Sequence, residues 1–154
     1  MEFIATSAKE TQKIAAKLIR DLVREKAERV LVLGLVGELG AGKTTFVQGL
    51  AKALKIKERV LSPTFVIFKR FKIYELRFKN LYHIDCYRIE KQEEVRELGF
   101  EEILKNPENL VVIEWAEKIK DALPKDAIWI KFEHAGEDRR KIKIQKSKIS
   151  PRTF

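Results

Sequence analysis

A glycine-rich stretch that holds a lysine and two threonines has the residue types and spacing of a phosphate-binding loop. Residues 37–45 read G-E-L-G-A-G-K-T-T and match the pattern G-x-x-x-x-G-K-T. In such a loop the backbone N–H groups surround the phosphates, the lysine reaches the β- and γ-phosphates, and the first threonine binds Mg²⁺. We therefore expect ATP or ADP to bind here with Mg²⁺. The residues expected to hold the nucleotide are Gly37, Glu38, Leu39, Gly40, Ala41, Gly42, Lys43, Thr44 and Thr45.

The segments on either side of this loop have the patterns of the strand and the helix that must position it. Residues 30–36 are apolar and rich in β-branched side chains, as in a fully buried strand. Apolar residues from Phe46 to Leu54 recur at helical spacing. The N-terminus of that helix would add partial positive charge beside the phosphates. A glycine-rich turn with a chance lysine is the alternative, and these flanks argue against it.

Two further predicted strands end in acidic residues that could act beside Mg²⁺. Residues 110–113 are apolar and are followed by Glu114, which is the pattern of a Walker B strand. Its acid would lie where open α/β sheets bind their ligands. The alternative is an ordinary strand that ends in a solvated glutamate.

A strand over residues 80–86 would place His83 and Asp85 on one face, because side chains alternate along a strand. Either side chain could contact the metal, its waters or the attacking water, and Arg88 could contact phosphate. Taken alone, His83 is more simply interpreted as a packed, hydrogen-bonded core residue, and Asp85 as a structural residue at a strand end. Whether Asp85 or Glu114 orders the attacking water stays open.

Two other residues have weaker patterns. Thr64, in the sequence S-P-T, follows the predicted loop helix and could act as a switch on the γ-phosphate side of Mg²⁺. A simple turn before a strand is the more common meaning of that tripeptide. Cys86 lies on a predicted buried strand, which favours a core position over a nucleophilic role.

The composition predicts one folded domain that does not span a membrane. The chain has 154 residues and is 45% hydrophobic, without an apolar run of bilayer length or the features of a signal peptide. A single cysteine suits a reducing cytoplasm. The net charge of +9 fits either an anionic partner such as nucleic acid or a surface rich in lysine and glutamate, and we favour the second for most of the lysines.

The order of the predicted elements indicates an α/β fold. We expect a single P-loop NTPase domain over residues 1–146, with a mixed parallel and antiparallel sheet flanked by helices, and a basic tail over residues 147–154. A capping box at Ser7 predicts a first helix that ends near Ala27. The other expected elements are a hairpin that joins a strand from 66 toward 71 to the strand 80–86, short helices over 93–104 broken at 99, a helix over 116–123, and a hairpin over 127–145.

Four motifs of this chain, in this order, resemble those of the TsaE (YjeE) family, the bacterial P-loop ATPases of tRNA threonylcarbamoyladenosine synthesis. The motifs are G-E-L-G-A-G-K-T-T, S-P-T-F, H-I-D-C-Y-R and V-I-E-W-A-E, and the resemblance extends from Ser7 to about Ile144. It implies a cytoplasmic protein that hydrolyses ATP slowly in support of the TsaB–TsaD pair. It also implies that tRNA is engaged indirectly, through that complex.

The resemblance implies roles for particular residues. Thr44 and Glu114 would be the Mg²⁺ ligands, and Lys43 would lie on the phosphates. Asp85 would matter for hydrolysis, and Thr64 would lie in the switch-like segment. The nucleotide would also contact the N-terminal segment near Thr11 and the C-terminal hairpin at Arg140 or the adjacent Arg139.

Two alternatives from other functional classes remain at this point. A P-loop small-molecule kinase could use Asp85 as its base and Arg139 or Arg140 in a lid. An RNA-binding module with a nucleotide switch could use the basic and aromatic residues around the hairpin near residues 69–79. Those residues are Lys69, Arg70, Phe71, Lys72, Tyr74, Arg77, Phe78 and Lys79.

Overall fold

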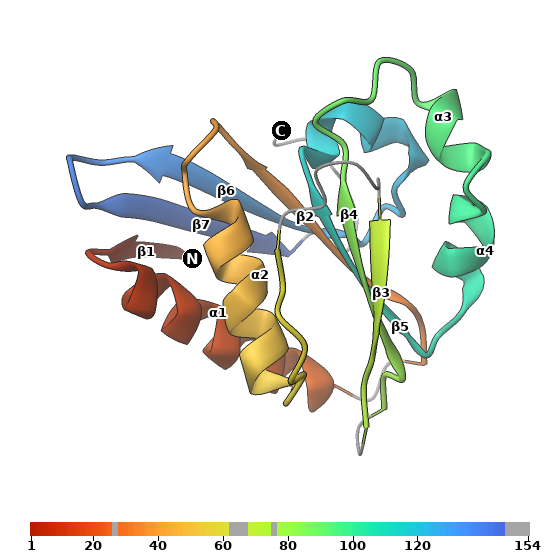
Figure 1. Cartoon of the computed structure of the whole chain (residues 1–154), viewed down its shortest axis with the longest axis horizontal. Helices are drawn as coiled ribbons and strands as arrows, with labels where there is room; N and C mark the ends of the chain where they lie inside the picture. Colours follow the sequence, from red (N-terminus) through yellow and green to blue (C-terminus); the bar gives the residue numbers. More distant parts are fainter. Residues whose placement is uncertain (26–27, 62–67, 75–76, 147–154) are drawn as a thin grey trace.

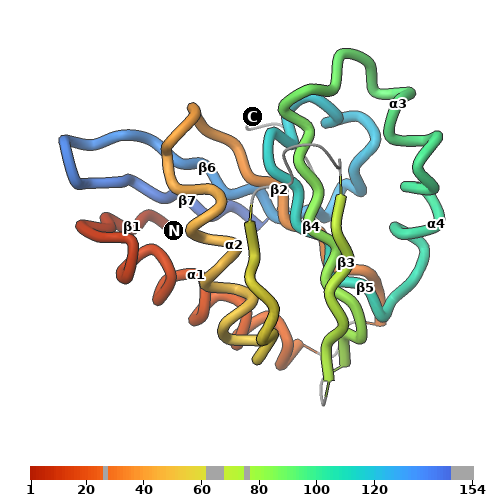
Figure 2. Tube along the Cα trace, in the orientation of Figure 1, coloured from red at the N-terminus to blue at the C-terminus, as the bar shows by residue number. Residues whose placement is uncertain are grey.

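The computed structural model describes residues 1–25, 28–61, 68–74 and 77–146. Within them the chain forms a seven-stranded sheet in the order β1-β7-β6-β2-β5-β4-β3 (Figures 1 and 2). The four central strands β6, β2, β5 and β4 are parallel, and antiparallel strands extend both edges. The predicted α/β fold with a mixed sheet is confirmed. The expected tail at 147–154 lies outside the described residues.

The bounds of the elements follow the predicted order. The strands are β1 (Glu2–Ala5), β2 (Leu31–Gly37), β3 (Phe68–Lys72), β4 (Asn80–Asp85), β5 (Asn109–Glu114), β6 (Ile128–His134) and β7 (Arg140–Lys146). The helices are α1 (Ala8–Val23), α2 (Lys43–Ala53), α3 (Glu93–Arg96), α4 (Phe100–Lys105) and the 3₁₀ helix η1 (Ala116–Ala122). No helix in the described part of the chain has both the length and the apolar character needed to cross a bilayer.

Helices cover the two faces of the sheet and divide the core into two layers. α1 and α2 pack on one face, while α3, α4 and η1 lie on the other (Figure 1). Alternation along β5 sends Leu110 and Val112 into the layer beneath α1 and α2, and Val111 and Ile113 into the opposite layer. By the same alternation, Glu114 lies on the face covered by α2.

The first helix begins as predicted and ends early. The Ser7 hydroxyl accepts a hydrogen bond from the Glu10 N–H (3.1 Å), as in a capping box, while the Glu10 carboxylate accepts one from the N–H of Thr6 (3.0 Å), the residue before the N-cap. The helix ends at Val23, before the predicted end near Ala27. Its last buried residue is Leu22, and the partly buried Val23 packs against the same core at the end of the helix.

The C-terminal hairpin and the antiparallel β3–β4 pair are confirmed. β6 and β7 are antiparallel, with Ile130 opposite Ile144, and β3 pairs with β4 with Phe71 opposite Leu81. β1 pairs with β7, at the far end of the sheet from β3. The predicted helix over 116–123 is a 3₁₀ helix that contains a non-helical residue at Ile119, so it forms two short turns.

A glycine lets α1 and α2 cross at close range. A Cβ atom at Gly49 on α2 would lie 2.6 Å from the Gln12 Cα and 2.7 Å from the Gln12 carbonyl oxygen on α1. The obstructing atoms belong to the backbone, so a side-chain rotation cannot relieve the clash. The crossing therefore fixes α2, and the loop at its start, against α1.

We expect Gly49→Ala to lower the free energy of unfolding by about 2 kcal/mol, because the added methyl group forces the two helices apart. In an open helix the same change stabilises by about 1 kcal/mol. Urea unfolding measures the difference. The pair Lys52→Ala and Lys52→Gly, at an exposed position of α2, gives the intrinsic difference between these two residue types as a control. A Gly49→Ala protein that is more stable than the parent would contradict this close packing.

Candidate functional site

The loop between β2 and α2 has the backbone that a phosphate requires. Gly40 (φ 76°) and Gly42 (φ 103°) adopt conformations that L side chains rarely adopt, and a Cβ atom at either would meet no other atom within 4 Å. Gly42 is the N-cap of α2 and has no side chain to bond the first N–H groups of the helix. The loop is thus open on the side where these N–H groups can take an anion, which fits the expected phosphate chain.

Lys43 is held at the start of α2 by groups on both sides of the loop. Its ammonium donates hydrogen bonds to the carbonyl oxygens of Gly37 and Glu38, the second at 3.0 Å. Its Nζ atom lies 4.1 Å from the centre of the Trp115 ring. Burial lowers the pKa of Lys43, while the carboxylates of Glu114, Glu117 and Asp85 act in the opposite direction. The surrounding carboxylates therefore favour the charged form that a phosphate needs.

Thr44 and Glu114 meet where α2 begins and β5 ends. The Thr44 hydroxyl lies 3.0 Å and 3.2 Å from the two carboxylate oxygens of Glu114, which is buried at the end of β5. The parallel pairing of β2 with β5 brings the two strand ends to the same edge of the sheet. A hydroxyl and a carboxylate are hard oxygen ligands of the kind that Mg²⁺ prefers beside a phosphate.

The described residues contain no group of three or more His, Cys, Asp or Glu side chains that could hold a metal ion. A Mg²⁺ ion at Thr44 and Glu114 would therefore complete its coordination with phosphate oxygens and water, as is usual for nucleotide sites. The donor set fits Mg²⁺ carried by a nucleotide better than a permanent metal cage.

The adjacent strand β4 adds two side chains on the same face. The predicted shared face of His83 and Asp85 follows from the register, in which His83 pairs with Val112 and Asp85 with Glu114. His83 is fully buried, and its Nε2 atom lies 2.5 Å from a Glu114 carboxylate oxygen. Asp85 is half-buried, and its carboxylate accepts a hydrogen bond from the Tyr87 N–H (2.9 Å).

His83 is thus packed and hydrogen-bonded, which is the simpler of the two sequence interpretations. The sequence did not predict that its partner is Glu114. The two residues are 31 positions apart, and only the parallel pairing of β4 with β5 brings them together. No local pattern could have signalled this contact.

The remaining predicted residues occupy different surroundings. An Nη atom of Arg140 lies 3.4 Å from the Gly40 carbonyl oxygen, so the C-terminal hairpin reaches the loop through this arginine. Thr11 is buried in α1, where its hydroxyl donates to the Ser7 carbonyl oxygen (3.3 Å). Thr64 lies outside the described residues. Cys86 is buried, and burial raises the pKa of its thiol to about 12, which agrees with a core position and not a nucleophile.

An aromatic pair beside the loop extends the site beyond the predicted residues. Trp115 follows Glu114 with a φ of 58°, an uncommon conformation for a bulky residue. Its ring centre lies 5.2 Å from that of Tyr87, and the Lys118 ammonium lies within 6 Å of both ring centres. The Glu117 carboxyl also lies here, and loss of hydration beside its neighbours raises its pKa. The sequence motif around Glu114 includes Trp115 and Glu117, but the arrangement of their side chains depends on the turn at Trp115.

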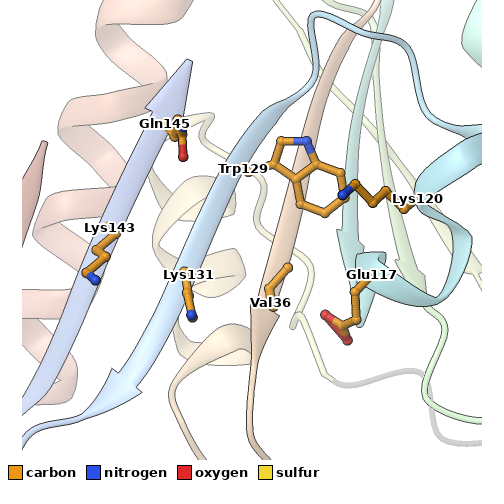
Figure 3. Close-up of a pocket in the computed structure, with 7 residues that line it drawn as sticks. All are labelled: Val36, Glu117, Lys120, Trp129, Lys131, Lys143 and Gln145. Carbon is orange, nitrogen blue, oxygen red and sulfur yellow. The ribbon is translucent and has the colours of Figure 1, made fainter. Parts of the chain in front are cut away.

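A hollow of about 490 Å³ lies on the opposite face of the sheet from α2 (Figure 3). It is lined by side chains of β6 and β7, such as Trp129, Lys131 and Lys143, together with Val36 and two residues of η1. Lys131 and Lys143 each lie 3.5–3.8 Å from the Glu133 carboxylate. The charges around this hollow are of both signs and mostly half-buried, unlike the fully buried carboxylate beside the loop.

The basic hairpin has its phenylalanines in the core. Phe71 and Phe78 are buried, and the Arg77 guanidinium donates to the carbonyl oxygens of Arg29 (3.1 Å) and Pro107 (3.3 Å). Tyr74 is exposed. Two of the three aromatic residues that could stack on RNA bases therefore serve packing instead.

Comparison with known proteins gives consistent similarities over most of the chain. The family model for threonylcarbamoyl adenosine biosynthesis protein TsaE matches residues 5–142. The chain is 40% identical to a tRNA threonylcarbamoyladenosine biosynthesis protein TsaE from Bacillus subtilis over 126 residues (82% of this chain and 76% of that protein). It is 38% identical to that of Rickettsia typhi over 141 residues (91% of each). A crystal structure of Bacillus subtilis YdiB superposes with a TM-score of 0.69 at 31% identity, over 96% of this chain and 85% of the other.

Proposed function

Because this chain belongs to the TsaE family of threonylcarbamoyl adenosine biosynthesis proteins, we propose that it binds ATP with Mg²⁺ and hydrolyses it slowly in support of that tRNA modification. The observation that carries the proposal is the contact of Thr44 with Glu114 at the mouth of the glycine loop. It joins the hydroxyl and the acid that phosphate-bound Mg²⁺ requires.

The side chains around the loop have different roles, which follow from where each one lies. Bound ATP with Mg²⁺ would supply a γ-phosphoryl group that the metal activates toward water. Lys43 exchanges its carbonyl partners for phosphate oxygens, since a charged donor bonds most strongly to a charged acceptor. Thr44 and Glu114 would hold the metal, and Arg140, which lies beside the Gly40 carbonyl, would contact the phosphates from the hairpin.

We propose that Asp85 orders the water that attacks the γ-phosphate. Both oxygens of Glu114 lie within hydrogen-bond distance of Thr44, and one also contacts His83. Glu114 is therefore better placed to bind the metal beside Thr44 than to accept a hydrogen bond from the attacking water. Asp85 is opposite Glu114 in the register and is more accessible to solvent. It can therefore accept a hydrogen bond from a water that lies next to the γ-phosphate.

We further propose that the chain acts as an accessory subunit to the TsaB–TsaD pair and meets tRNA through that complex. The core position of Phe71 and Phe78 supports this over direct RNA binding. The kinase alternative needs an acceptor pocket beside the γ-phosphate; the hollow of Figure 3 does not supply it, because that hollow lies on the other face of the sheet.

Replacing the loop lysine should weaken nucleotide binding. We expect Lys43→Ala to reduce the affinity for ADP by about 10- to 100-fold, the value of a charge-assisted hydrogen bond. Isothermal titration calorimetry with ADP in the presence of Mg²⁺ measures this affinity. Lys52→Ala removes an exposed lysine from the same helix and should bind as the parent does. Equal affinities for the parent and Lys43→Ala would refute the assigned nucleotide site.

The two acids should separate metal binding from hydrolysis. We expect Glu114→Gln to raise the Mg²⁺ concentration needed for tight ADP binding at least about 10-fold. Asp85→Asn should keep that Mg²⁺ dependence and slow ATP hydrolysis about 100-fold. Phosphate release into solution is the measure of hydrolysis. If Glu114→Gln kept the parent's Mg²⁺ dependence while Asp85→Asn lost it, the two roles would be reversed.

The accessory role makes a prediction of its own. Slow phosphate release by the chain alone should change when the TsaB–TsaD pair is added. Direct tRNA binding by the chain alone should be weak at physiological salt. Tight tRNA binding with a steep salt dependence would favour the RNA-binding alternative, and phosphate found on a metabolite instead of in solution would favour the kinase.

A further inference from the structure

His83 has one polar contact in the described part of the chain, and that contact is Glu114. The imidazole is fully buried on β4, and its Nε2 atom lies 2.5 Å from a carboxylate oxygen of Glu114 on β5. Its Nδ1 atom is buried and has no hydrogen-bond partner among the described residues. The ring is therefore anchored at one end only.

The contact itself determines which nitrogen carries the hydrogen. A carboxylate can only accept, so Nε2 must be the donor. In a neutral imidazole this leaves Nδ1 as a bare acceptor. His83 thus presents its Nε2–H to Glu114.

We propose that His83 is a positioning residue that holds the Glu114 carboxylate in the orientation that binds Mg²⁺; this rests on the nucleotide function proposed above. One oxygen of Glu114 receives His83 and lies 3.2 Å from the Thr44 hydroxyl, and the other lies 3.0 Å from the same hydroxyl. Without the imidazole, the carboxylate can rotate about its last bond. The bond from His83 fixes that rotation, as second-shell partners do for metal ligands.

His83 is badly placed to bind the metal itself. Its Nε2 faces Glu114, and its Nδ1 is buried. Packing alone does not explain the residue either, because its strand neighbours Leu81 and Ile84 fill the core with apolar side chains. At this buried position an imidazole costs more free energy than an apolar side chain would. Its hydrogen bond to Glu114 therefore indicates a role in the site.

The test compares variants by the Mg²⁺ concentration at which ADP binding is half-enhanced, measured by calorimetry over a Mg²⁺ series. We expect His83→Leu to raise this concentration about 10- to 100-fold and to leave Mg²⁺-free ADP binding unchanged. His83→Gln, whose amide N–H can reach Glu114, should restore most of the loss. If the leucine variant does not fold, His83→Asn replaces it, because its side chain is too short to reach Glu114.

Asn80→Ala is the matched control. Asn80 bonds Asn109 (3.0 Å) at the other end of the same strand pair, so its loss perturbs β4 and β5 without touching Glu114. It should leave the Mg²⁺ requirement unchanged.

Three results would contradict the proposed role of His83 and leave the proposed nucleotide function intact. These are an unchanged Mg²⁺ requirement in folded His83→Leu or His83→Asn, equal losses in these variants and in His83→Gln, or an equal loss of Mg²⁺-free ADP binding. Absence of ADP binding by the parent protein would instead overturn the proposed nucleotide function, and the role of His83 with it.

Discussion

The contact between the Thr44 hydroxyl and the Glu114 carboxylate is the interaction on which the rest of the site depends. It joins the first turn of α2 to the end of β5, two elements separated by 70 residues in the chain. The contact is possible only because β2 and β5 are parallel neighbours whose ends lie at one edge of the sheet. Alternation along β5 then turns Glu114 toward α2, while Ile113 enters the opposite layer.

A carboxylate in this position is costly to bury, and the surrounding structure offsets that cost. Water is excluded from Glu114, so its oxygens need donors from the protein. Thr44 supplies one from α2, and His83 supplies another from β4. The close crossing at Gly49 holds α2 against α1, which keeps the first donor in place. The acid is thereby oriented by elements on two sides.

Local patterns predicted the elements well, and long-range pairing decided the details of the site. The loop, its strand and its helix were predictable because glycine spacing and apolar periodicity act within a few residues. The capping box at Ser7 was predictable for the same reason. The bond from His83 to Glu114 depends on the register of β4 against β5, and the pairing of β1 with β7 joins opposite ends of the chain. Neither leaves a signal in neighbouring residues.

The register that places Asp85 opposite Glu114 also has a consequence for how such a sequence persists. Neighbouring carboxylates repel each other, so two acids at one pair of strand ends cost the fold some free energy. Selection for stability alone would remove one of these acids. A function that needs both acids, such as the proposed Mg²⁺ site, would retain them at this cost. We expect stabilising substitutions to accumulate elsewhere in the sheet, where no such compromise exists.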